Sequence, residues 1–232
     1  MGGRTWIALA LLIAAPTAGV ATQTGADVDE AQKASLDTAS RALLDGHPDE
    51  ALTRIEPVIA AYRSAYAAET RQTYCGMSTA QTLAYMALAT SEKHDAVALG
   101  PGYCEALYVK GFALVDLKRL PEARAVYEQV VTLAPMHAHF LTELGQTYRP
   151  DRNWPKMLDL CTKAAGLADL APPEKVASEH SFAWRCMGYA LTEQGKYDES
   201  EALYRKCLEV DPNDAKAKSE LSYIAEQRRK KV

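Results

Sequence analysis

Three glycines, Gly111, Gly145 and Gly188, recur along the sequence at a fixed interval. Gly145 follows Gly111 after 34 residues, and Gly188 follows Gly145 after the same interval plus nine residues. Two further sets keep this register: Tyr127, Cys161 and Tyr204, and Ala123, Met157 and Ser200. Such self-similarity predicts a chain of repeated units, each unable to bury its apolar face alone, which stack to form one continuous core.

The unit at residues 181–214 shows what each position does. Gly188 and Ser200 are small, which lets two neighbouring helices approach closely. Pro212 ends the second helix, because proline cannot continue a helix and pushes the preceding residue out of helical space. Apolar residues fill the seam between the helices at steps of three and four: Trp184, Met187 and Leu191. The unit therefore predicts a helix, a turn and a second helix.

This order of an aromatic residue, an apolar–Gly pair, a small residue, an aromatic residue and a closing proline resembles the tetratricopeptide repeat family. The resemblance implies an all-α fold, a right-handed superhelical solenoid of antiparallel helix pairs with a C-terminal capping helix. It places a single solenoid at residues 31–228. The expected repeats span about 32–65, 70–101, 104–137, 138–171 and 181–214.

Three stretches depart from the regular pattern. Residues 172–180 form a nine-residue insertion whose prolines favour a helix start, so we expect one long helix from about Pro173 to Gln194, with a flexible loop as the alternative. Residues 214–228 are predicted to form the solvating cap. The stretch from Thr70 to Leu99 is helical by composition, but its repeat register is ambiguous. Its second helix must end before the turn at 100–102.

The N-terminus carries the pattern of a targeting signal. A single positive charge precedes an apolar run at residues 6–15, and small residues follow at 18–21. This order predicts a secretory signal peptide at residues 1–21, with a later cleavage near Ala26 as the alternative. The apolar run is shorter than the roughly 20 residues that span a bilayer, so no membrane insertion is expected after cleavage. We predict an exported protein, periplasmic or secreted, with a flexible N-terminus at residues 22–30.

The charge balance narrows the class of partner. The formal net charge is −4, whereas proteins that bind nucleic acid or anionic membranes concentrate Lys and Arg. The one basic cluster, at residues 228–231, stands at the C-terminus, where cations favour the negative end of a helix dipole. A protein or peptide partner is therefore expected, and nucleic acid is not.

The five cysteines suggest disulfides in an exported chain, because disulfides persist in oxidising compartments. We pair Cys75 with Cys104 and Cys161 with Cys186, each pair bridging neighbouring helices. An odd count leaves one thiol, and Cys207 is assigned to the core of the last helix pair. The alternative is that several of these cysteines are small buried hydrophobic residues.

The sequence offers little catalytic chemistry. It holds no Gly-rich phosphate loop, no His-Glu-x-x-His zinc helix and no Cys-x-x-Cys pair. His137 and His139 diverge if both lie on a helix, so no metal site is predicted. Cys75 and His94 could form a nucleophile and base only if the fold happened to bring them together, and no sequence pattern predicts that. We expect no enzyme activity, no cofactor and no metal, and a thiol-dependent enzyme is the least favoured alternative.

The resemblance implies that a partner binds the concave wall formed by the first helix of each repeat. The residues carried over to that wall are Tyr108, Phe112, His139, Gln146, Arg149, Phe182, Arg185 and Tyr189. A row of exposed aromatic residues indicates an interaction surface, since such residues dominate interface hot spots. The alternative is that the N-terminal helices or the insertion cover this face.

Chaperone-binding members of the family clamp a carboxylate with lysine and asparagine side chains, and that clamp is absent here. The matching positions hold Tyr108, Phe112, Thr142 and Gln146. The sequence thus predicts a non-catalytic scaffold of the cell envelope or secreted space that binds a peptide segment of a partner in its groove. The runner-up is a structural protein that assembles as a homodimer.

Overall fold

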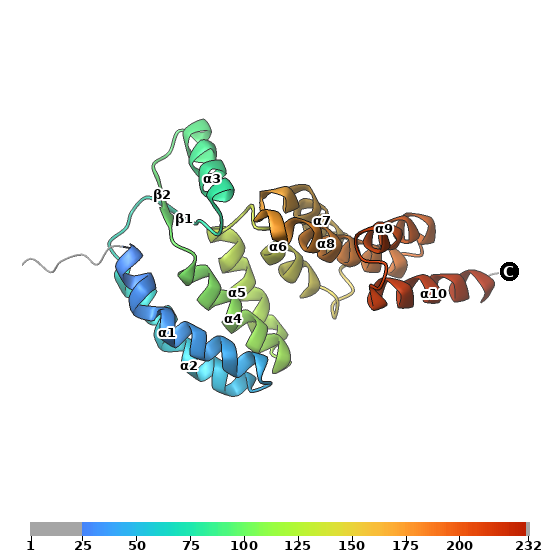
Figure 1. The fold of residues 1–232 in the computed structure, drawn as a ribbon, viewed down its shortest axis with the longest axis horizontal. Helices are drawn as coiled ribbons and strands as arrows, with labels where there is room; N and C mark the ends of the chain where they lie inside the picture. The colour runs from blue at the N-terminus through green and yellow to red at the C-terminus, as the bar shows by residue number, and fades with distance from the viewer. Residues whose placement is uncertain (1–24, 231–232) are drawn as a thin grey trace, which may run out of the picture.

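The computed structural model describes residues 25–230, with side chains from Asp27 onward, and consists mainly of helices (Figure 1). The predicted signal peptide at residues 1–21 lies outside the described residues. In chain order the elements are α1 (Gly25–Leu44), α2 (Pro48–Ala65), β1 (Gln72–Cys75), α3 (Thr79–Glu92), β2 (Ala96–Leu99), α4 (Gly102–Asp116), α5 (Leu120–Leu133), α6 (Ala138–Gln146), α7 (Trp154–Leu167), the 3-10 turn η1 (Ala168–Leu170), α8 (Pro173–Glu193), α9 (Tyr197–Val210) and α10 (Ala215–Lys230).

Within residues 25–230 the helices form four antiparallel pairs, α1–α2, α4–α5, α6–α7 and α8–α9, which stack into an elongated curved body (Figure 1). The first helix of each pair also contacts the first helix of the next, as α4 does with α1 and α8 with α6. Helix α10 packs on α9 and α8 at the C-terminal end. The predicted solenoid of helix pairs is confirmed. In the described part of the chain, no helix is both long and apolar enough to cross a bilayer.

The glycines of the 34-residue pattern lie where two helices of a pair touch. A Cβ atom on Gly188 would lie 2.9 Å from Cζ of Tyr204, and one on Gly111 would lie 2.8 Å from Cε1 of Tyr127. Both tyrosine rings are fully buried. The regular glycines are therefore explained by sterics, because Gly111 and Gly188 each leave room for a large ring from the second helix, and Gly145 leaves room for Sγ of Cys161.

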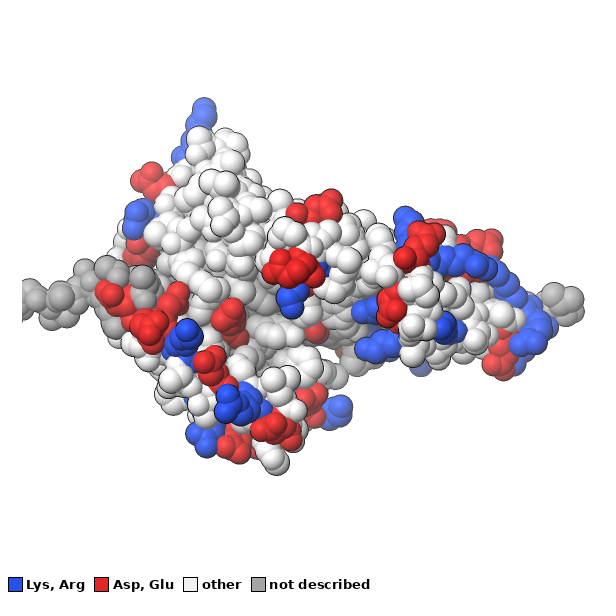
Figure 2. All heavy atoms as spheres, viewed as in Figure 1, with Lys and Arg blue, Asp and Glu red and all other residues white. Residues whose placement is uncertain are grey.

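The expected repeat at residues 70–101 is wrong. Strands β1 and β2 form a two-stranded parallel sheet in which Gln72 pairs with Ala96 and Cys75 with Leu99, and only α3 between them is helical. Parallel strands require a long crossover, which α3 supplies. This β1–α3–β2 lobe stands out from the stack (Figure 1), and the face seen in Figure 2 carries few charges, in keeping with the absence of charged residues at 79–91.

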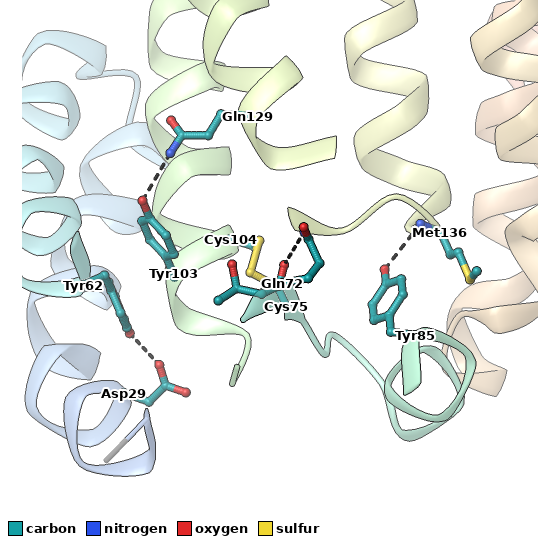
Figure 3. Close-up of a disulfide and its surroundings, with 10 residues drawn as sticks. Asp29, Tyr62, Gln72, Cys75, Tyr85, Tyr103, Cys104, Gln129 and Met136 are labelled. Atoms are coloured by element: carbon teal, nitrogen blue, oxygen red, sulfur yellow. Dashed lines mark hydrogen bonds between the residues drawn. A yellow bond between two sulfur atoms is a disulfide. The ribbon is translucent and has the colours of Figure 1, made fainter. Parts of the chain in front are cut away.

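The predicted flexible N-terminus at residues 22–30 is also corrected, because α1 already begins at Gly25. The side chain of Val28 is buried. The hydroxyl of Tyr62 on α2 donates a hydrogen bond of 2.8 Å to Oδ1 of Asp29 (Figure 3). A buried apolar contact and a hydrogen bond to α2 hold the first turns of α1 in place.

The nine-residue insertion lengthens a helix instead of forming a loop. Helix α8 begins at Pro173 and ends at Glu193, with proline in its first turn as expected for a helix start. The cap helix α10 begins after Asp214, whose Oδ1 accepts the N–H of Ala217 at 3.0 Å. This is the hydrogen bond expected of an N-cap residue.

Two disulfides join the residues paired in the sequence analysis. Cys75 is bonded to Cys104 and ties β1 to α4 (Figure 3), and Cys161 is bonded to Cys186 and ties α7 to α8. The first pair corrects the expectation that each bond bridges two helices, since Cys75 lies on a strand. Cys207 is unbonded and fully buried in the last helix pair.

The start of α6 predicts a dependence of stability on pH. Nδ1 of His137 accepts the N–H of Phe140 at 3.4 Å as an N-cap. Burial lowers the pKa of His137 to about 4. An unfolded chain binds this proton near pH 6.5, so between about pH 6.5 and 4 it holds more protons than the native chain. Neutral His137 therefore makes its full contribution to the free energy of unfolding above pH 6.5. This contribution is lost as the pH falls toward 4, by up to about 1.4 kcal/mol per pH unit.

Urea unfolding at a series of pH values tests this expectation. His137→Asn keeps an oxygen that can cap α6 but removes the titration, so its stability should fall less between pH 7 and 4 than that of the wild type. His47→Asn is the matched control, since His47 precedes α2 without forming a side-chain cap. Parallel curves for the wild type and His137→Asn would refute the assignment.

Candidate functional site

A cavity of about 400 Å³ opens between α6, α8 and the beginning of α10. We call it the C-terminal cavity. The structure brings five of the eight predicted groove residues to its walls: Gln146, Arg149, Phe182, Arg185 and Tyr189. Sequence reasoning missed the opposite wall, which α10 supplies with Ala215, Lys216, Ser219 and Glu220. The pattern of residues 214–228 predicts a solvating cap, and no signal in the sequence places this helix beside the groove.

Two arginines organise the polar rim of the cavity. The Arg149 guanidinium lies 3.8 Å above the centre of the Tyr189 ring, which in turn meets Trp154 edge-on at 5.9 Å. Nη1 of Arg185 forms an ion pair of 2.6 Å with Oδ2 of Asp214 at the start of α10. Arg149 forms no ion pair within residues 25–230, so its guanidinium is held in place by an aromatic face and keeps hydrogen-bond donors for a ligand.

The floor of the cavity is apolar and rigid. Met157, Cys186 and Tyr204 line it, and all three are buried. Cys186 is bonded to Cys161, which fixes the spacing of α7 and α8 beneath the cavity. Burial raises the pKa of Glu220 on the α10 wall, although Arg149 acts in the opposite direction. An apolar floor with a few polar groups at the rim is the usual composition of a small binding pocket.

The other three predicted residues lie outside this cavity, in an aromatic cluster beside it. Oη of Tyr108 lies 3.1 Å from Nε2 of His139, and the rings of His139 and Phe182 are 4.8 Å apart. Phe112 lies 6.2 Å from the Tyr108 ring. Tyr108 also packs against the core, and burial raises the pKa of its hydroxyl. It is half-buried instead of fully exposed, so Phe182 is the residue that joins the cluster to the cavity.

Two carboxylates that the sequence analysis did not list flank His139. Glu143 lies 3.6 Å from Nε2 and Glu179 lies 3.4 Å from Nδ1, and both side chains are largely buried. Burial raises the pKa of Glu143, and the nearby Glu179 charge acts in the same direction. Glu143 stands four residues after His139, a spacing that could have suggested the contact, whereas Glu179 reaches it only because the insertion is helical.

The described residues contain no group of three His, Cys, Asp or Glu side chains arranged to hold a metal ion. Four of the five cysteines are bonded in disulfides. Burial raises the pKa of the fifth, Cys207, to about 11. Since the thiolate is the reactive form, this arrangement disfavours thiol chemistry at neutral pH.

Two family models described as tetratricopeptide repeat match the chain, at residues 105–137 and 181–214. These ranges correspond to the pairs α4–α5 and α8–α9. A search of curated protein sequences found no match.

Solved structures share the fold over most of the chain. A putative kinesin light chain with TPR-like repeats from Podospora anserina is 13% identical, with a TM-score of 0.56 over 86% of this chain and 87% of that one. MamA of Desulfovibrio magneticus RS-1 is 18% identical, with a TM-score of 0.54 over 85% of each chain. MamA of MSR-1 is 18% identical, with a TM-score of 0.51 over 86% of this chain and 88% of that one. The solved structures share the helix-pair solenoid fold of this chain, and the two matched repeats identify it as a tetratricopeptide repeat protein.

Proposed function

We propose that this protein is a non-catalytic scaffold that binds a peptide segment of a partner protein in the C-terminal cavity. One observation carries the proposal: five residues that the family resemblance assigns to a binding wall meet around a single cavity with an apolar floor. Aromatic and arginine side chains, here Phe182, Tyr189 and Arg149, are the types that dominate interface hot spots.

The composition of the cavity indicates how a peptide would sit in it. Phe182 and Met157 offer apolar contact for one buried side chain of the partner, while Gln146 and Arg149 offer hydrogen-bond donors at the rim. A volume of about 400 Å³ lies within the range of small-molecule pockets and suits one or two side chains. The rest of the segment would then run along the groove outside the cavity.

Export of the scaffold to the periplasm or the secreted space is part of the proposal. The signal pattern at residues 1–21 supports it, and so do two disulfides, since such bonds are rare in reducing compartments. Cell fractionation with an antibody to the mature protein tests this part. Recovery of the full-length chain in the cytoplasm, with reduced cysteines, would contradict it.

The binding proposal predicts that Tyr189→Ala weakens peptide binding by about thirtyfold, which corresponds to about 2 kcal/mol. The substitution removes an aromatic wall of the cavity and the surface that supports Arg149. The probe is a peptide selected from a phage-displayed library of random dodecapeptides against the mature protein, and calorimetry measures its affinity.

Tyr223→Ala is the matched control, because Tyr223 is a tyrosine on α10 that is 44% exposed and does not line the cavity. Its affinity for the selected peptide should equal that of the wild type, and both variants should keep the wild-type melting temperature within a few degrees. If Tyr189→Ala binds as tightly as Tyr223→Ala, the cavity is not the binding site. If light scattering shows that the protein alone is a stable dimer, and the dimer does not bind the peptide, a self-assembling structural protein is favoured instead.

A further inference from the structure

The β1–α3–β2 lobe ends at an open edge of its sheet. In a strand, the N–H and C=O groups of one residue point toward one neighbouring strand, and those of the next residue point to the other side. The N–H of Gln72 bonds to the carbonyl of Asp95 at 3.1 Å, and Gln72 lies opposite Ala96 in the register. The N–H and C=O groups of Ala96 and Ala98 therefore point away from β1, to the outer edge of β2.

These outward groups of β2 have no partner. Within residues 25–230, no hydrogen bond reaches the N–H or C=O groups of Ala96 or Ala98. The side chains of β2 carry no charge, and its first three residues keep part of their surface exposed. Natural proteins usually protect such an edge with charges, proline or a covering element, because it is a ready site for another strand.

The opposite edge of the sheet is protected. Strand β1 lies against α5, and the ion pair of Arg71 with Glu69 stands directly before the strand. The disulfide of Cys75 anchors the end of β1 to α4, and the ring of Tyr74 stacks on that of Tyr85 in α3 at 4.9 Å. The sheet is thus held in place from both faces, so the free edge of β2 is preformed and little ordering is needed for a strand to join it.

The outer edge of β2 is complementary to itself. When two copies pair antiparallel, Ala96 lies opposite Ala98 of the second copy, and Ala98 opposite its Ala96. Each of these two pairs exchanges two hydrogen bonds, which satisfies every outward group of both edges. A two-fold axis then passes between the two Val97 residues, the symmetry of most homodimers. Asp95 lies opposite Leu99 of the second copy, so no like charges meet directly.

Helix α3 gives a second reason to expect another copy of the chain beside the lobe. Residues 79–91 contain no charged side chain, and Leu83 is 66% exposed. Because α3 contacts both strands of its sheet, the α3 helices of two paired copies would lie about two strand spacings apart, or about 10 Å. Packed helices are separated by about 8–10 Å. Each uncharged helix would therefore find the same uncharged helix next to it, without a charge losing its hydration.

We infer that the protein forms a homodimer through the outer edge of β2. The two lobes then share one four-stranded sheet in the order β1–β2–β2–β1, with both α3 helices on the same face. The inference goes beyond the proposed function and does not depend on it, because the lobe and the C-terminal cavity lie at different ends of the body (Figure 1). Such a dimer presents two cavities and can bind two peptide segments at once.

A cysteine introduced at the two-fold axis tests the pairing directly. In the proposed register the two copies of Val97 form a non-hydrogen-bonded pair, whose Cα atoms lie about 4.5 Å apart, within the reach of a disulfide. Val97→Cys in the mature protein should therefore give a covalent dimer under mild oxidation. Ala98→Cys is the matched control, since its two copies would lie about 8 Å apart, too far to be bonded. If neither variant cross-links, or if both do so equally, the register is wrong.

Proline on the edge tests the hydrogen bonds. Ala98→Pro removes one outward N–H from each copy, which deletes two of the proposed bonds and breaks none inside the lobe. Sedimentation equilibrium should show dimerisation weakened roughly tenfold or more. Thr73→Pro is the control, because Thr73 holds the equivalent outward position on β1, and this variant should dimerise as the wild type does. Equal dissociation of both variants, or a wild type that is monomeric at every concentration, would overturn the inference.

The peptide selected for the cavity separates this inference from the proposed function. Ala98→Pro should bind the peptide as tightly as the wild type, whereas Tyr189→Ala should lose the peptide and keep the dimer. If the wild type is a monomer in which an added extended peptide protects the amides of residues 96 and 98 from hydrogen exchange, the edge takes a foreign strand instead. The proposal of a second copy is then wrong, and the cavity can still stand.

Discussion

Replacement of Cys75 and Cys104 by alanine is expected to lower the free energy of unfolding by about 3.5 kcal/mol. The disulfide joins residues separated by 29 positions, and without it the unfolded chain regains the entropy of an open loop of that length. The closed segment begins at the last residue of β1 and contains α3 and β2, and the two-stranded sheet of β1 and β2 is too small to be stable alone. The lobe should therefore loosen before the helix pairs do.

Urea unfolding followed by circular dichroism measures the global effect, and amide hydrogen exchange across residues 72–99 measures the local one. Cys207→Ala is the matched control, because it removes a buried cysteine without removing a cross-link. It should cost about 1 kcal/mol, much less than the double variant. A reduced wild type that unfolds at the same urea concentration as the oxidised protein would show that the bond contributes nothing.

Gly188→Val is expected to destabilise the protein by about 3 kcal/mol, because overpacking a filled seam forces side chains or backbone to move. The new Cβ would lie 2.9 Å from Cζ of Tyr204, closer than two carbon atoms can approach, and that ring is buried and cannot swing into solvent. Valine adds two methyl groups beyond the Cβ. The pair α8–α9 would have to separate, which would also distort the C-terminal cavity.

Gly166→Ala, also in a helix, is expected to change the stability in the opposite direction. Gly166 lies in α7, and a Cβ there meets nothing within 4 Å. Alanine should stabilise the helix by about 0.5–1 kcal/mol through its higher helix propensity. Thermal unfolding of both variants measures the contrast. Equal melting temperatures would show that Gly188 is not required for close packing.

The repetitive part of the chain could be predicted because each position has a local steric reason. Gly111 and Gly188 mark close contacts between helices because a large ring faces each of them. Pro212 follows the end of a helix because proline cannot continue one. The resemblance to the repeat family also assigns Arg149 and Tyr189 to the wall, and both line the cavity. The steric assignments depend on neighbours three or four residues away, which the sequence displays directly.

The lobe at residues 70–101 could not be predicted in the same way. Its strands are four residues long, too short for an alternating pattern to stand out, and the alanine-rich stretch between them favours a helix. Strand β1 forms only because β2, more than twenty residues away, offers hydrogen bonds. The composition of residues 70–101 therefore predicts helices throughout this stretch and does not reveal the two strands.

The sequence by itself determined the helix pairs, their contacts through small residues, the long α8 and the candidate disulfide partners, because these depend on local spacing and on residue type. Only the tertiary structure decided that α10 folds against α8 to make the second wall of the cavity, that Glu179 meets His139, and that Ser181 is buried without a partner. Those features depend on how distant helices approach one another. That approach is set by the packing of the whole solenoid, since no single helix can bury its apolar face alone.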